Sequence, residues 1–230
     1  LMSKEIDLFL CSFNPRATAA TEEKLSEIYL NHADNTEERE ITTIHMVEKQ
    51  DCQATGSELS GGYGQHIVFV LDQSGSMSYA WSGVVAAYQN YIQRRTQNQN
   101  LSDLISVIQF DSTSTITVQN ESIGSVPTSL SFSGQGTSYS PAAKHAYSVA
   151  LGTPLSHVPV VVFMSDGRTE ASDAAYAAQC FSSLNHEIQR QREHDLELHV
   201  IAFGSVDTAQ LKQIANSSPQ GQLHTSADTA

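Results

Sequence analysis

The sequence contains few basic residues and few cysteines. Of its 230 residues, 12 are Lys or Arg and 25 are Asp or Glu, which gives a formal net charge of −13. No basic cluster stands out, so nucleic acid is excluded as a partner, because binding it requires a basic surface. The three cysteines are widely spaced and form no C-x-x-C pair, which argues against a zinc knuckle or a disulfide framework. Their odd number slightly favours a cytoplasmic setting over an extracellular one, although nothing in the sequence fixes the compartment.

Long apolar runs and familiar catalytic motifs are also missing. No apolar run approaches the roughly 20 residues of a membrane span, so none is predicted in this chain. The nine histidines include no H-x-x-x-H pair. The motifs G-x-S-x-G, G-x-G-x-x-G and G-x-x-x-x-G-K-[ST] do not occur. These absences disfavour zinc-hydrolase, nucleophile-elbow, dinucleotide-binding and P-loop sites.

A short apolar run at residues 67–71 is followed at once by Asp72, Ser74 and Ser76. The run is rich in β-branched and aromatic side chains, which predicts a buried strand. In an open α/β sheet, ligands bind at the carboxyl ends of the strands. Hard oxygen ligands in that position suit a small hard cation such as Mg²⁺. Taken alone, the pattern is equally typical of an ordinary strand-to-helix turn.

Two later segments each supply a further oxygen donor. Thr137 follows a glycine-rich loop that leads into a predicted helix, and Asp166 follows a second buried strand at residues 159–165. The full set of candidate ligands is Asp72-x-Ser74-x-Ser76, Thr137 and Asp166. In order and in local context, this set resembles the metal-ion-dependent adhesion site of a von Willebrand factor type A domain. The resemblance covers roughly residues 63–230.

The resemblance implies a bound Mg²⁺ or Mn²⁺, with Ca²⁺ as a third candidate. In this family Ser74 and Ser76 would contact the cation through their hydroxyls, and Thr137 and Asp166 would alternate between direct and water-mediated contact. Asp72 would mainly hold waters and neutralise charge. One coordination position would then be available to an acidic side chain of a partner.

Two expectations about the site come from the residues themselves. We expect Asp72 to lie at the surface rim, so that replacing it would leave the packing intact. We also expect Gly75, Gly136 and Gly167 to allow the backbone to approach closely, because glycine has no Cβ.

The remaining pattern predicts an α/β fold with a doubly wound, mostly parallel, Rossmann-like sheet and helices on both faces. The expected strands are 67–71, 105–110, 114–118, 159–165, 196–203 and 221–226, and the expected helices are 78–96, 140–151, 171–194 and 207–215. The short link after residue 110 makes 114–118 an antiparallel edge strand. Ser140 is expected to cap the second helix, with Pro141 as its first residue.

Residues 1–62 differ from the rest of the chain, because they hold 12 of the acids but only 5 of the bases. They predict strands at 6–13 and 41–47, a helix at 17–31 and a linker that begins at residue 55. This segment is either the end of an upstream region or a set of added edge elements. Residues 63–230 are expected to form the type A domain without its last helix.

Three functions remain open from the sequence. The first is a non-enzymatic protein-binding module that engages an Asp or Glu of a partner through a bound Mg²⁺ or Mn²⁺. The alternative is a Mg²⁺-dependent hydrolase or phosphatase that uses Asp72. The third is a scaffold domain whose metal is purely structural.

Overall fold

The computed structural model describes residues 3–10, 41–48, 64–98, 101–166, 169–203 and 208–225. Its centre is a six-stranded sheet in the order β5-β4-β3-β6-β7-β8. The strands are β3 (Gly64–Asp72), β4 (Leu104–Phe110), β5 (Ser114–Ser122), β6 (His157–Ser165), β7 (Glu197–Ala202) and β8 (Gln220–Thr225). Neighbouring strands are parallel except for the antiparallel pair β4–β5 at one edge. The predicted fold class is therefore confirmed.

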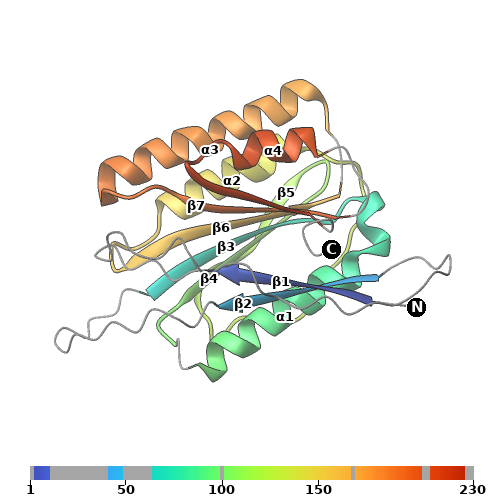
Figure 1. Ribbon diagram of the computed structural model, residues 1–230, viewed down its shortest axis with the longest axis horizontal. Coiled ribbons are helices and arrows are strands. Elements are labelled where there is room, and N and C mark those ends of the chain that lie inside the picture. Colours follow the sequence, from blue (N-terminus) through green and yellow to red (C-terminus); the bar gives the residue numbers. More distant parts are fainter. Residues whose placement is uncertain are drawn as a thin grey trace, which may run out of the picture.

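Helices cover both faces of this sheet, as Figure 1 shows. On one face lie α2 (Tyr139–Leu151), α3 (Ala171–Arg192) and α4 (Ala209–Ala215). The other face is covered by α1 (Trp81–Gln97), which follows the short 3₁₀ helix η1 (Gly75–Tyr79). The sequence predicts one helix at residues 78–96, whereas in the structure α1 begins at Trp81 and residues 78 and 79 belong to η1.

The central strand β3 is buried on both faces. Ile67, Phe69 and Leu71 pack in the apolar cluster on the α1 side, and Val68 and Val70 pack in the cluster on the opposite side. Because successive side chains of a strand point to opposite faces, a strand covered on both faces has to be apolar at every position. This explains the continuous apolar run that precedes Asp72.

The predicted cap of α2 is wrong. The helix begins at Tyr139, one residue before Ser140, and no side chain of its own N-cap residue bonds to its first turn. Instead, the carboxylate of Asp173 on α3 accepts the backbone N–H of Tyr139 at 2.6 Å and that of Ser140 at 3.1 Å. A carboxylate from another helix satisfies the free N–H groups that a local serine was expected to satisfy.

The first two strands form a separate sheet. β1 (Ser3–Leu10) and β2 (Ile41–Glu48) pair in parallel with each other and not with the six-stranded sheet. They lie on the α1 side of the molecule (Figure 1). The predicted helix at 17–31 and the linker up to residue 63 lie outside the described residues. Among the described residues, no helix is both long and apolar enough to cross a membrane.

Gly221 in β8 lies very close to the end of α4. A Cβ at this position would lie 1.7 Å from the backbone oxygen of Ala215. We expect Gly221→Ala to lower the free energy of unfolding by about 2 kcal/mol or more, because the backbone has to move to admit the methyl group. Gly124→Ala is the matched control, since a Cβ there would meet no atom within 4 Å. Urea denaturation measures both variants, and equal unfolding midpoints would contradict this account of the packing.

Candidate metal centre

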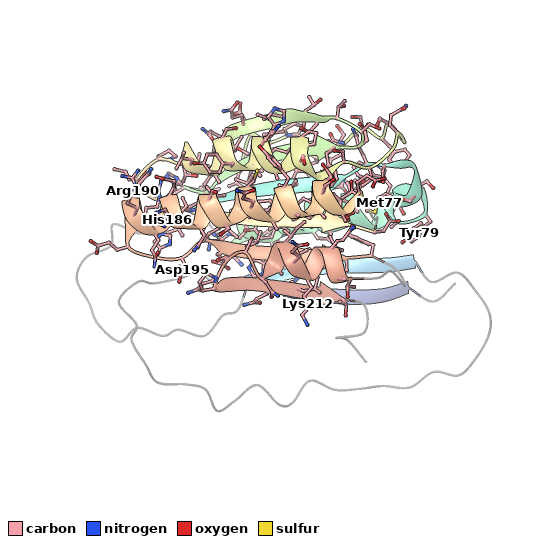
Figure 2. The ribbon with its side chains drawn as sticks, turned by 90° about the horizontal axis from the view of Figure 1, so that it is seen from above. Met77, Tyr79, His186, Arg190, Asp195 and Lys212 are labelled. Carbon is pink, nitrogen blue, oxygen red and sulfur yellow. The ribbon has the colours of Figure 1, made fainter. Side chains whose placement is uncertain are left out.

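Three neighbouring strands of the sheet reach an aspartate at their carboxyl ends. Asp72 is the last residue of β3, and Asp111 and Asp166 directly follow β4 and β6. Because these strands are parallel neighbours, the three aspartates come to the same edge of the sheet. In Figure 2 this is the end of the molecule marked by Met77 and Tyr79 of η1, opposite the end marked by Arg190.

Hydrogen bonds connect four of the five predicted site residues. The backbone N–H of Ser74 donates to Asp72 Oδ1 at 2.8 Å, which fixes the turn after β3. The hydroxyl oxygens of Ser74 and Ser76 lie 3.2 Å apart. The hydroxyl of Ser76 in turn donates to Asp166 Oδ1 at 2.9 Å. The structure thus brings Asp72, Ser74, Ser76 and Asp166 together, although Asp72 and Asp166 lie on different strands.

The loop that carries Thr137 lies against this turn. The N–H of Gly75 donates to the backbone oxygen of Gln135 at 2.8 Å, and the N–H of Gly134 donates to that of Gln73 at 3.0 Å. Thr137 is therefore held close to the turn through its backbone. Within the described residues, its hydroxyl makes no hydrogen bond to the other four predicted site side chains.

The glycines of these loops are placed where space is short. A Cβ on Gly75 would lie 3.1 Å from the backbone oxygen of Gly134, and one on Gly136 would lie 2.9 Å from Ser112 Oγ. The expected close approach is confirmed at both of these positions. Gly167 lies outside the described residues.

The position expected for Asp72 is wrong, because its side chain is fully buried. Its Oδ1 accepts from Ser74, and its Oδ2 accepts from the hydroxyl of Ser165 at 2.5 Å. The hydroxyl of Tyr139 lies 3.1 Å from Ser165 Oγ and extends this buried network. Asp72 ends the central strand of the sheet, so its neighbours on both sides enclose it.

Burial disfavours the charged form of both carboxylates. Burial raises the pKa of Asp72 despite hydrogen bonds from Ser165 and Ser74, and the charge of Asp166 raises it further. Burial likewise raises the pKa of Asp166, against the effect of hydrogen bonds from Ser76 and Tyr79. Among the described residues, no basic side chain pairs with either carboxylate. A cation bound beside them would favour the charged form of both carboxylates.

The donor set fits a hard divalent cation such as Mg²⁺, which prefers carboxylate, hydroxyl and water oxygens. In the part of the chain that the structure describes, no three His, Cys, Asp or Glu side chains form a metal-binding group. The candidate centre has two carboxylates, so hydroxyls of Ser74, Ser76 and Thr137 would have to complete it together with water.

Asp173 is a positioning residue that sequence reasoning missed. Besides capping α2, its carboxylate accepts from the hydroxyls of Ser138 at 3.1 Å and Thr169 at 2.6 Å. The hydroxyl of Thr169 also lies 3.2 Å from the backbone oxygen of Thr137. Asp173 thus connects the first turn of α3 to the loop that carries Thr137. Its only sequence signal is an acid in the first turn of a helix, which normally serves its own helix.

Asp111 holds the same loop from the other side. Its carboxylate accepts from the hydroxyl of Ser133, and its backbone oxygen accepts from the N–H of Ser138 at 2.7 Å. Burial alone would raise its pKa, but the hydrogen bonds from Ser133 and Thr113 outweigh this effect and lower it. Asp111 is therefore a structural acceptor, in contrast to Asp72 and Asp166.

Tyr79 contacts the site from η1. Its hydroxyl lies close to the carboxylate of Asp166, and burial together with the negative charge of that carboxylate raises the pKa of Tyr79 to about 12. The ring itself is half-exposed. Tyr79 is three residues from Ser76, but sequence reasoning gave it no role, because nothing in the sequence shows that it turns toward β6.

The comparisons with known proteins agree with this fold. The family model of the von Willebrand factor type A domain matches residues 66–230, so the chain belongs to this family. No curated protein sequence matches the chain.

Solved structures of several bacterial proteins share the fold. The pilus adhesin SpaC from Lactobacillus rhamnosus GG has a TM-score of 0.52 and 13% identity, over 72% of this chain and 28% of that one. The PilB minor pilin from Streptococcus sanguinis has a TM-score of 0.53 and 10% identity, over 80% of this chain and 63% of that one. BatB, a conserved hypothetical protein from Bacteroides thetaiotaomicron, has a TM-score of 0.50 and 15% identity, over 70% of this chain and 90% of that one. The chain therefore spans less than two thirds of the adhesin and of the minor pilin.

Replacing the buried carboxylate tests its electrostatic cost. An aspartate whose pKa is raised by folding binds its proton more tightly in the folded state, so its ionisation lowers stability as pH rises through that pKa. In chelator at pH 7 we expect Asp72→Asn to unfold at a higher temperature than the wild type. Asparagine can still accept from Ser74 and donate to Ser165, but it carries no charge.

The advantage of the variant should shrink as the pH falls through the raised pKa of Asp72 in the folded protein, and it should be gone below about 4, the ordinary pKa of an aspartate. Circular dichroism during heating measures both proteins across this range. A variant that is less stable than the wild type at pH 7 in chelator would show that Asp72 stabilises the fold through its charge.

Proposed function

We propose that the chain is a non-enzymatic, cation-dependent protein-binding module whose site takes an Asp or Glu side chain of a partner. One observation carries the proposal: Asp72 and Asp166 are buried side by side, joined through the hydroxyls of Ser74 and Ser76, with no basic partner among the described residues. Membership of the type A family supports a role in protein interaction. The shared fold of a pilus adhesin and a minor pilin is consistent with adhesion.

Each site residue has a distinct part in this proposal. Ser74, Ser76, Thr137 and Asp166 would hold Mg²⁺ or Mn²⁺, with Ca²⁺ as a weaker candidate. Asp72 shapes the turn, because its carboxylate fixes the backbone of Ser74, and it adds negative charge. When bound, the cation would supply an electrophilic position for an anionic oxygen of the partner.

The geometry disfavours the phosphatase alternative. A nucleophilic aspartate needs an oxygen that can reach the substrate, whereas Asp72 is fully buried and both of its oxygens already accept hydrogen bonds. A scaffold domain with a purely structural metal remains as the outcome that the binding experiments below would reveal.

Two serines of η1 provide a matched pair for testing the metal site. Ser76 contacts both Ser74 and Asp166, whereas Ser78 is exposed and two residues further along. We expect Ser76→Ala to weaken Mg²⁺ and Mn²⁺ binding at least tenfold, on the order of the loss seen when metal-site groups are removed. Ser78→Ala should bind like the wild type. Isothermal titration of the metal-free proteins measures these affinities. If the wild type binds neither ion up to millimolar concentration, the proposal is wrong.

The partner's contribution can be tested on any protein that the chain captures in Mg²⁺. We expect a single Asp or Glu of the partner to dominate, so that its change to Ala weakens binding about 100-fold, as for other buried charged contacts. Chelator should release the partner fully, whereas added salt should weaken binding only modestly. If binding persists in chelator, or if no single acid matters, the metal is structural and the scaffold interpretation holds.

A further inference from the structure

Three aromatic side chains lie around the candidate metal centre, and we refer to Tyr79, Trp81 and Phe132 as the aromatic rim. Tyr79 is 50% exposed and Phe132 is 40% exposed. Trp81 is half-buried, and the centre of its ring lies 5.4 Å from that of Phe132. Aromatic residues are enriched in protein interfaces, so their exposure beside a binding site indicates a contact surface.

The exposure of Phe132 does not result from a loosely held loop. The backbone oxygen of Ser131 accepts from the side chain of Gln109 at 2.6 Å, and the hydroxyl of Ser133 donates to Asp111. Gly134, with a positive φ of 75°, donates its N–H to the turn after β3. The residues on both sides of Phe132 are therefore anchored while its ring faces solvent. Such preorganisation lowers the cost of ordering the loop when a partner binds.

The aromatic rim is connected directly to the predicted metal ligands. The hydroxyl of Tyr79 lies close enough to Asp166 for the charge of that carboxylate to raise the pKa of Tyr79. On the other side, the Phe132 loop is bonded to Gln73, which immediately follows Asp72. Figure 2 places Tyr79 at this end of the molecule. A partner side chain that reached the centre would therefore bring its neighbours onto these rings.

The two chain segments that carry the rim contain no charged residue, and the charges beside them in the described residues are the carboxylates of Asp111 and Asp166. Residues 73–93 and 122–143 contain no Asp, Glu, Lys or Arg, although charged residues make up 16% of the chain and its net charge is −13. A partner segment with several acids would find no basic side chain in these two segments, whereas an apolar side chain would find aromatic surface. The surface therefore matches a segment that is neutral apart from the acid it presents.

We propose that the aromatic rim is a docking surface for a protein segment in which an apolar side chain lies within about three residues of the acidic one. The acid would be recognised at the metal centre, and the apolar side chain would pack on Trp81 and Phe132. This inference rests on the proposed function and adds to it the sequence chemistry of the partner.

A library of random heptapeptides displayed on phage provides the probe. Phage are bound to the immobilised chain in Mg²⁺ and eluted with EDTA, so that only cation-dependent binders are sequenced. We expect the wild type to select Asp or Glu together with a Leu, Ile, Phe or Pro within about three positions. Phe132→Ser should still select the acid but lose the apolar preference. A peptide from the wild-type selection should bind this variant about tenfold more weakly, in line with the loss of one aromatic contact.

Two further variants control for effects on folding. Phe132→Tyr retains the ring and should select as the wild type does. Leu155→Ser removes an apolar side chain that is 74% exposed in the connection before β6, at the opposite end of that strand from Asp166, and it should change nothing. Titration with Mg²⁺ should give the same affinity for all three variants.

The outcomes separate this inference from the function on which it rests. Selection of acids without an apolar preference in the wild type overturns the docking surface and leaves the metal-dependent function standing. An absence of any EDTA-eluted enrichment overturns both. If Phe132→Ser weakens Mg²⁺ binding itself, the ring acts through the metal centre, and its role as a docking surface is wrong.

Discussion

The buried carboxylate of Asp72 is the contact on which the geometry of the site depends. It ends the central strand, accepts the N–H of Ser74 to shape the turn, and accepts the hydroxyl of Ser165 from the neighbouring strand. Its charge is costly there, because burial raises its pKa. A buried carboxylate at the carboxyl edge of a parallel sheet makes a site that favours positive charge. This is the physical basis for expecting a cation rather than an anion or a neutral ligand.

Two other aspartates show how differently the same side chain can be used. Asp111 and Asp173 accept several hydrogen bonds each, and these lower their pKa values against the effect of burial. They hold the Thr137 loop from opposite sides, through Ser133 and Thr169 respectively. The ionised form is stabilised at these two positions and destabilised at the centre. The aspartates around the site are thus stabilised as carboxylates by hydrogen bonds, whereas the two at the centre would be stabilised by a bound cation.

The charge distribution of the chain predicts which kind of partner it would bind. The chain as a whole is acidic, and 12 of its 25 acids lie in residues 1–62. Long-range repulsion therefore disfavours a strongly acidic partner, even though the centre itself suits one carboxylate. The segments that carry Tyr79 and Phe132 contain no charged residue, so they also favour a partner with few charges. They offer aromatic contact and no residue that could form an ion pair. Recognition would then combine one charged contact with apolar packing beside it.

The sequence by itself determined the strands, the order of the elements and four of the residues that come together at the carboxyl edge. It could do so because the apolar run before Asp72 and the spacing of Ser74 and Ser76 are local patterns. Only the tertiary structure decided that Asp72 is buried, that α2 is capped by Asp173, and that Tyr79 turns toward Asp166. Those contacts join elements that lie far apart in the chain, for example the 34 residues between Tyr139 and Asp173. No local pattern encodes such a distance, because it depends on how β3, β6 and the helices pack against one another.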